Sequence, residues 1–194
     1  MWKGRKIILR RLTATDAETV QKWYVDREFR MAYNEYTSVE LDSIREEIKK
    51  ADQEISDPRT TKVVYMVVRK ADKQPIGLAC LRKIDRQNGN AEVVLGIGEK
   101  DMRLAGYGVD MLIVLLDILF YELGLEKSYL RIYDNHDLGL NSALNFGFVI
   151  EGRMRKQAFL EGKYVDVLIL GLLKNEYEAL SIVPKWKSKY SQNE

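Results

Sequence analysis

The glycine-bearing stretch at residues 103–108 constrains this chain more than any other feature. Its sequence, Arg-Leu-Ala-Gly-Tyr-Gly, follows an apolar run at residues 91–98 that is typical of a strand. It precedes an apolar segment at residues 109–123 that is typical of a helix. Glycines let the backbone adopt positive φ and approach a ligand closely, and the first N–H groups of a helix attract anions. The order strand, glycine turn, helix therefore predicts a phosphate-binding loop or, as the alternative, only a tight strand-to-helix turn.

The composition indicates a single globular domain. A chain of 194 residues with 46% hydrophobic content is long and apolar enough to bury a sizeable core. We expect that domain to span residues 1–183, with a mobile tail at residues 184–194. The 31 basic and 29 acidic residues leave a formal net charge of only +2, which argues against a strongly basic nucleic-acid binder.

The sequence contains no apolar run of membrane-spanning length, and its first six residues lack the apolar region of a signal peptide. We therefore expect a cytoplasmic protein without a membrane or nucleic-acid partner. The one cysteine, Cys80, cannot form an intrachain disulfide, and its apolar surroundings predict a buried structural thiol rather than a nucleophile. Because His136 is the only histidine, no histidine-based metal cluster is expected.

The hydrophobic pattern predicts an α/β chain with a mixed sheet. Alternation and β-branched content predict strands at residues 7–12, 61–69, 76–81, 91–98, 125–133, 148–159 and 164–173. Apolar spacing predicts helices that begin near residues 13–16 and helices at residues 38–55, 106–123 and 136–145. Gln-Asn-Gly at residues 87–89 predicts a hairpin turn. The alternation of strand and helix around the glycine stretch implies a crossover connection, and hence a partly parallel sheet flanked by helices.

Several further motifs follow the glycine stretch in the order of a known family. They are Tyr-Leu-Arg-Ile-Tyr at 129–133, Asn-Phe-Gly-Phe at 145–148, Glu-Gly-Arg-Met-Arg-Lys at 151–156 and Glu-Gly-Lys-Tyr-Val-Asp-Val at 161–167. From about residue 6 to residue 177 the chain resembles the GNAT superfamily of N-acetyltransferases, in the branch of ribosomal-protein N-terminal and spermidine acetyltransferases. In that superfamily the motif [R/Q]-x-x-G-x-[G/A] binds the pyrophosphate of acetyl-CoA.

The resemblance implies where acetyl-CoA, the expected co-substrate, would bind, and it implies no metal. The pyrophosphate would lie on the loop formed by Arg103, Leu104, Ala105, Gly106, Tyr107 and Gly108. The pantetheine arm would lie in a gap where the strands at 91–98 and 125–133 splay apart. Leu95, Gly96 and Ile97 would face the cofactor, helped by a bulge that this strand often carries in the family.

The chain departs from the family at its usual general acid. Laid without gaps against the branch pattern N-x-x-A-I-x-x-Y-x-K-x-G-F, the asparagine position is His136 and the tyrosine position is Ala143. That tyrosine is often the proton donor to the leaving thiolate. Three hypotheses follow: transfer proceeds without this acid, Tyr133, His136 or Ser142 replaces it, or the protein is a CoA-binding regulatory or scaffold protein that has lost efficient catalysis.

Three other residues are candidates for the acceptor side. Glu92 is a candidate base acting through water or, alternatively, a polar strand-end residue paired with a cation. Tyr33 and Glu35 fall in the region that forms the acceptor wall in related proteins, although ordinary loop residues are an equal interpretation. We predict an acetyl-CoA-dependent N-acetyltransferase whose acceptor is a small-molecule amine (a polyamine, amino sugar or antibiotic) or a protein N-terminus. A homodimer is left open. A nucleotide-binding domain is disfavoured because no Gly-Lys-[Ser/Thr] is present.

Overall fold

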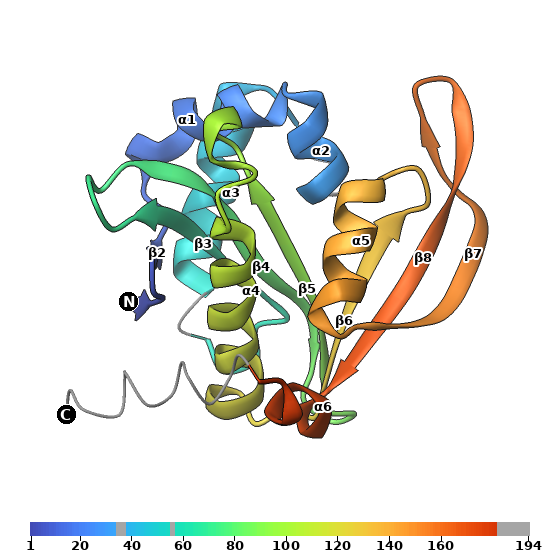
Figure 1. Ribbon diagram of the computed structural model, residues 1–194. Coiled ribbons are helices and arrows are strands. Elements are labelled where there is room, and N and C mark those ends of the chain that lie inside the picture. The colour runs from blue at the N-terminus through green and yellow to red at the C-terminus, as the bar shows by residue number, and fades with distance from the viewer. Residues whose placement is uncertain (34–37, 55–56, 182–194) are drawn as a thin grey trace.

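One mixed β-sheet organises the molecule. The computed structural model describes residues 1–33, 38–54 and 57–181, and within them eight strands lie in the order β1-β2-β3-β4-β5-β6-β8-β7 (Figure 1). Their bounds are β1 (Trp2–Lys3), β2 (Ile7–Arg11), β3 (Lys62–Arg69), β4 (Pro75–Asp85), β5 (Asn90–Ile97), β6 (Lys127–Tyr133), β7 (Val149–Leu160) and β8 (Lys163–Leu173). Neighbouring strands are antiparallel except β5 and β6, which are parallel. The expectation of an α/β fold with a mixed sheet is confirmed.

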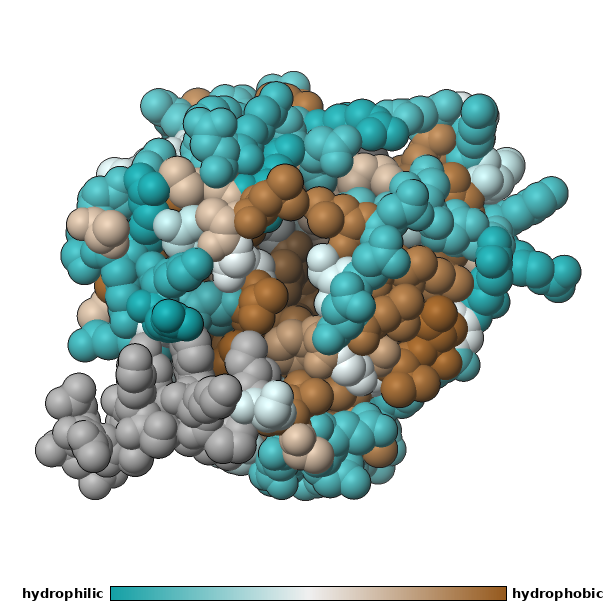
Figure 2. All heavy atoms as spheres, viewed as in Figure 1, coloured by the Kyte–Doolittle hydropathy of each residue, from teal (hydrophilic) through white to brown (hydrophobic). Residues whose placement is uncertain are grey.

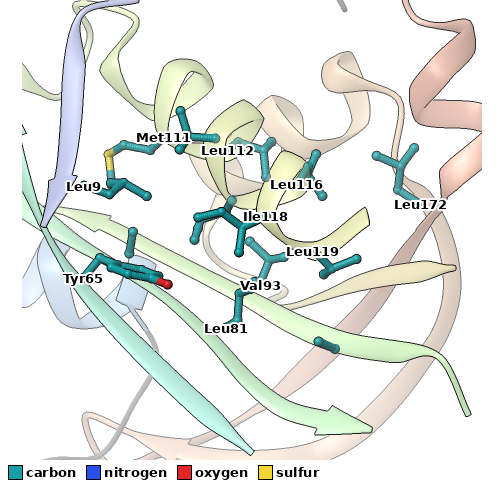
Figure 3. Packing of buried hydrophobic residues seen from close by; sticks show 14 of the residues in the cluster. Leu9, Tyr65, Leu81, Val93, Met111, Leu112, Leu116, Ile118, Leu119 and Leu172 are labelled. Carbon is teal, nitrogen blue, oxygen red and sulfur yellow. The ribbon is translucent and has the colours of Figure 1, made fainter. Parts of the chain in front are cut away.

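Helices cover both faces of this sheet. One face carries α1 (Ala17–Tyr24), α2 (Arg27–Tyr33) and α3 (Leu41–Glu54), and the other carries α4 (Tyr107–Asp117), α5 (Asp137–Phe146) and α6 (Lys174–Ala179). Successive side chains of a strand point to opposite faces, so Cys80 packs under the first group of helices. Its neighbour Leu81 packs under the second group (Figure 3). Burial on both faces explains why these strands are nearly continuous apolar runs. Cys80 is fully buried, as predicted.

The helix α2 is the one described helix of the N-terminal half that the sequence pattern missed. It spans Arg27–Tyr33 and buries Phe29, Met31 and Tyr33, whereas the sequence suggested a loop around residue 33. The Asp26 carboxylate accepts the backbone N–H of Phe29 at 2.9 Å and so caps the first turn. Seven residues are too few for a helical period to stand out, and tertiary packing decides the conformation.

The segment after the glycine stretch is helical throughout, but its last turn is wider than expected. The α-helix α4 ends at Asp117, and a π-helical turn follows over Ile118–Glu122. There the N–H of Leu123 bonds the carbonyl of Ile118 at 2.9 Å. The hairpin predicted at residues 87–89 is confirmed, since β4 and β5 are antiparallel and Gly89 has a φ of +67°.

Two sequence-based expectations fall on residues that the structure does not describe. Glu35 and the predicted tail at residues 184–194 lie outside the described ranges. Within those ranges, no helix combines the length and apolar character needed to cross a membrane.

Candidate functional site

The strands β5 and β6 pair briefly and then separate. Their parallel ladder contains only Asn90–Lys127, Ala91–Ser128 and Glu92–Tyr129. Beyond it β5 continues against β4, and β6 continues against β8, so the two strands diverge (Figure 1). Among the described strands none pairs with this edge of β5 from residue 93 to residue 97. Backbone N–H and C=O groups along that edge are therefore available to a ligand.

The expectation of a bulge in β5 is wrong. Every residue of β5 from Glu92 to Ile97 pairs in register with β4. The irregularity lies in β4 instead, between Arg82 and Asp85, where Lys83 has a φ of 51°. The gap beside β5 thus arises from the divergence of β6, and not from a distortion of β5 itself.

A cavity of about 350 Å³ fills the gap between the two strands. Figure 2 shows a hollow with hydrophobic walls on the same side of the molecule. Its apolar walls come from β5, β6, α4 and α5, for example Val93, Leu112, Leu130 and Phe146. Its charged and polar side chains are Glu28, Arg103, Arg131, His136 and Ser142. A mostly apolar hollow with a few convergent polar groups is the usual form of a small-molecule site.

The glycine stretch forms one end of this cavity. Gly106 is the N-cap of α4 and has a φ of +76°, a conformation that a side chain disfavours. Leu104, Gly106 and Gly108 line the cavity, whereas Ala105 and Tyr107 do not. On the far side of the loop, Lys6 Nζ donates to the Ala105 carbonyl at 2.8 Å and lies 5.5 Å from the centre of the Tyr107 ring. The first N–H groups of α4 have no partner within the helix and suit an anion.

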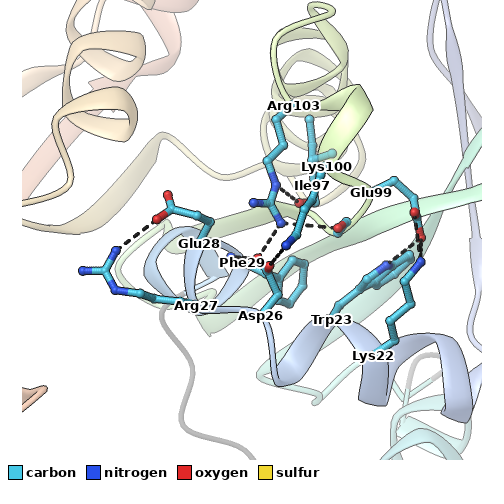
Figure 4. Close-up of polar contacts among 11 residues, drawn as sticks. Lys22, Trp23, Asp26, Arg27, Glu28, Phe29, Ile97, Glu99, Lys100 and Arg103 are labelled. Carbon is cyan, nitrogen blue, oxygen red and sulfur yellow. Dashed lines mark hydrogen bonds and ion pairs between the residues drawn. The ribbon is translucent and has the colours of Figure 1, made fainter.

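The Arg103 side chain ties this loop to the start of α2. Its Nη2 lies 2.5 Å from Asp26 Oδ1, and its Nε donates to the Ile97 carbonyl at 3.2 Å (Figure 4). Lys100 Nζ lies 3.2 Å from the other oxygen of Asp26. Burial alone would raise the pKa of Asp26, but its hydrogen bonds and these cations lower it below the ordinary value. Arg103 therefore lines the cavity and at the same time forms an ion pair with Asp26.

The predicted cofactor-facing residues of β5 all line the cavity. They are Leu95, Gly96 and Ile97. Gly96 also allows α2 to approach, because a Cβ there would lie 2.8 Å from Phe29 Cε2. At the next glycine, Gly98, a Cβ would overlap the Trp23 ring. Glycine at the end of β5 thus brings the N-terminal helices directly over the strand.

Tyr33 does not form part of the cavity wall among the described residues. Its side chain is 2% exposed and stacks on Phe29 with ring centroids 5.3 Å apart. It belongs to the core beneath α2, because the segment that the sequence suggested as a loop is a helix with this face turned inward.

Glu92 is buried in a cluster of cations and does not line the cavity. Its Oε1 lies 2.7 Å from Arg82 Nη2 and 2.9 Å from Arg131 Nε, and its Oε2 lies 3.6 Å from Lys83 Nζ. Burial pushes the pKa of Glu92 upward, but Arg82 and Arg131 outweigh it and hold the pKa below its ordinary value. The geometry matches the alternative that the sequence offered, a polar strand residue paired with cations.

The three candidates for a replacement acid are placed differently. His136 and Ser142 line the cavity, together with Ala143 at the position of the usual tyrosine. Tyr133 does not line it, and burial raises the pKa of its phenol. His136 is the N-cap residue of α5, and burial lowers the pKa of its imidazole below 6.5, while Glu28 and Asp137 act in the opposite direction.

Sequence reasoning missed Glu28, Asp26 and Arg131. Asp26 and Glu28 belong to the start of a helix that carries no clear periodic signal, so nothing pointed them toward a site. Arg131 lies on β6 near Glu92 only because the two strands pair in parallel, which no local pattern specifies. Among the described residues, no three His, Cys, Asp or Glu side chains gather closely enough to hold a metal ion.

Comparisons with known proteins agree with this geometry. The sequence model of the acetyltransferase (GNAT) domain matches residues 6–149. The chain is 28% identical over 108 residues to the SPbeta prophage-derived N-acetyltransferase YokL of Bacillus subtilis, covering 56% of this chain and 60% of that protein. It is 30% identical over 111 residues to the spermidine N(1)-acetyltransferase of Vibrio cholerae, covering 57% and 64% respectively. Both alignments therefore span less than two thirds of the relative.

Solved structures extend the likeness over nearly the whole chain. The crystal structure of spermidine N-acetyltransferase from Vibrio cholerae in complex with CoA and spermine superposes with a TM-score of 0.78. The superposition covers 89% of this chain and 98% of that chain at 24% sequence identity, so it shows a shared fold. The family match covers most of the chain, and the sheet, the splayed strands and the glycine-capped helix accompany it. The chain belongs to the GNAT family of acetyltransferases.

Proposed function

We propose that this protein transfers the acetyl group of acetyl-CoA to the primary amine of a small molecule. One observation carries the proposal: the unpaired edge of β5 leads directly to the glycine-capped N-terminus of α4, along a single cavity. An edge of free backbone groups suits an amide-containing arm, and a helix N-terminus suits a phosphate. Family membership supports the same chemistry.

The residues of the loop and of β5 would divide the binding of CoA between them. The N–H groups from Leu104 to Gly108 would hold the pyrophosphate, and Arg103 would add its charge at the same end. The edge of β5 from residue 93 to residue 97 would bond the pantetheine amides as a neighbouring strand would. The thioester would then lie at the other end of the cavity, beside His136, Ser142 and Ala143.

The chemical step needs a neutral amine and a leaving thiolate. Holding both reactants in line supplies a large part of the acceleration. Because Ala143 offers no proton, we propose that the thiolate of CoA leaves without a phenol donor. Ser142, which directly precedes Ala143, carries a hydroxyl group that lines the cavity. Tyr133 and Glu92 do not line the cavity, so we propose that neither of them touches the reacting atoms.

The spermidine acetyltransferase relative supports a small-molecule amine, and a protein N-terminus is the other candidate. The test measures CoA binding by calorimetry and release of free thiol from acetyl-CoA with four amines: spermidine, glucosamine, kanamycin and a serine-initiated peptide. We expect turnover with at least one small-molecule amine. Tight CoA binding without turnover on any amine would favour the regulatory alternative instead.

A further inference from the structure

Among the residues that the structure describes, two titratable side chains of the cavity have no assigned role in binding CoA. Of the charged groups that line it, Arg103 is held by Asp26, and Arg131 is held by Glu92. Glu28 and His136 remain. Glu28 bonds the neighbouring Arg27 at 3.0 Å, and its side chain is 55% exposed, so part of the carboxylate stays accessible.

These two side chains come from helices on opposite sides of the opening. Glu28 lies in the first turn of α2, and His136 caps α5, with the splayed ends of β5 and β6 beneath (Figure 1). They line one cavity. The negative charge of Glu28 also acts on the imidazole, raising the pKa of His136 against the effect of burial. A carboxylate and an imidazole thus face the same small volume.

The imidazole is seated on a glycine of its own helix. A Cβ at Gly139 would lie 2.6 Å from His136 Nδ1 and 2.7 Å from Cε1, so any side chain there would displace the ring. Gly139 has no positive φ to explain its presence. Glycine in a helix is destabilising relative to alanine, and here it leaves room for the ring. Burial keeps the imidazole neutral near pH 7, which suits a proton acceptor rather than a donor.

We propose that Glu28 and His136 form the acceptor-amine site, with Gly139 as the positioning residue that seats the imidazole; this rests on the proposed acetyl transfer. The Glu28 carboxylate binds the ammonium group, and His136 removes one proton from it. The nitrogen lone pair attacks the thioester carbonyl, a C–N bond forms, and the C–S bond breaks with its electron pair on sulfur. The second proton of the nitrogen passes to that sulfur, and His136 releases its own proton to solvent.

The surrounding charges fix the expected pH dependence. The charges that act on His136 are Glu28 on α2 and Asp137 on α5. Arg131 on β6 and Arg103 line the same cavity. Removing the charge of Glu28 removes one influence that raises the pKa of His136. In Glu28→Gln the pKa of His136 should therefore fall, and the acid limb of the rate profile should move to lower pH.

The chain offers a clean measurement because His136 is its only histidine. In the full-length protein without a histidine tag, the imidazole NMR signals report this residue alone. The pKa of His136 is followed in wild type, Glu28→Gln and a control, Glu18→Gln, which removes an exposed acid of α1. We expect a lower pKa in Glu28→Gln and the wild-type value in Glu18→Gln.

Kinetics on the best amine of the four-amine panel complete the test. We expect His136→Ala to lower kcat by about 100-fold or more with CoA affinity unchanged. Glu28→Gln should raise KM for the amine by about 10-fold and change kcat less. Gly139→Ala should lower kcat by about 10-fold while its Tm stays level or rises, because alanine favours the helix. Its control is Gly152→Ala, where a Cβ meets nothing within 4 Å.

Each arm has a result that overturns the proposal. If His136→Ala keeps more than about half of the wild-type kcat, His136 is not the base. If Gly139→Ala has the same kcat as Gly152→Ala, Gly139 does not position the imidazole. If the KM for the amine is unchanged in Glu28→Gln, Glu28 does not bind the ammonium group. If wild type binds CoA yet acetylates none of the four amines, the proposed function itself fails. If the wild type acetylates an amine and the variants at Glu28, His136 and Gly139 remain equally active, this inference fails and the proposed function stands.

Discussion

The sharpest test of the phosphate loop compares Gly106→Asp with Gly106→Asn. Gly106 has a φ of +76°, and asparagine and aspartate are the side chains that tolerate this conformation best. A Cβ at this position would meet nothing closer than Lys6 Nζ at 3.5 Å, so both variants have room. They are equal in shape and differ by one negative charge. Their comparison therefore separates electrostatic repulsion of the CoA phosphates from backbone strain.

The size of the effect follows from the expected geometry. A carboxylate about 5 Å from one phosphate charge costs about 3 kcal/mol at an effective dielectric constant of about 20. Lys6, which is beside the loop, neutralises part of this charge, and salt screens more. A net cost of about 1.5–2 kcal/mol remains, which is about 10- to 30-fold in the dissociation constant. Gly106→Asn should weaken CoA binding by only a few-fold.

The assay is calorimetric titration of CoA into both variants at low and high salt. The Debye length shrinks from about 10 Å at 0.1 M to about 3 Å at 1 M, so the ratio of the two dissociation constants should approach one in high salt. Circular dichroism with thermal melts checks that both proteins fold equally well. Equal CoA affinities at low salt, or a ratio that salt does not change, would refute an anion on this loop.

Three further predictions test the surroundings of the site. Ala143→Tyr should fold and should leave the transfer rate unchanged or raise it, because the new side chain points into the cavity; a loss of turnover with CoA binding intact contradicts this. Asp110→Ala should lower the free energy of unfolding by about 3 kcal/mol in denaturant titration, because its buried carboxylate accepts three backbone N–H groups from residues 5–7, whereas exposed Asp101→Ala should change little. Because the pKa of Glu92 is lowered in the folded state, its contribution to stability is complete above the unfolded pKa and is lost as the pH falls through the folded value. Acid unfolding of Glu92→Gln should therefore start from a lower stability at neutral pH and decline less steeply; a slope equal to that of wild type would count against the ion pairs.

Much of the backbone plan was predictable from local patterns. The turn at residues 87–89, the glycine-capped helix and the last hairpin follow from residues that are close in the chain. Such features depend on conformational preferences of glycine and on apolar periodicity, which act within a few residues. The glycine loop at one end of the cavity follows from the same local preferences, although Ala105 and Tyr107 of that loop do not line the cavity.

The other end of the cavity was less predictable because its groups come from separate elements. Tyr33 was expected at the acceptor wall but lies in the core, since α2 is too short for a periodic signal. Glu92 was a candidate base, and only the pairing of β4, β5 and β6 places Arg82 and Arg131 around it. No sequence pattern indicated a role for Glu28, although it lines the cavity.

The sequence by itself determined most of the strands and the long helices, the glycine turn and the family to which the chain belongs, but not the short helix α2. The tertiary structure decided which side chains face the gap between β5 and β6. It also decided which of them form ion pairs with neighbouring residues, as Arg103 does with Asp26 and Arg131 does with Glu92. The division has a physical cause. Local conformation is set by neighbours along the chain, whereas the surroundings of a charged side chain depend on contacts between distant residues. Glu92 and Arg131 are 39 residues apart, and Asp26 and Arg103 are 77 residues apart.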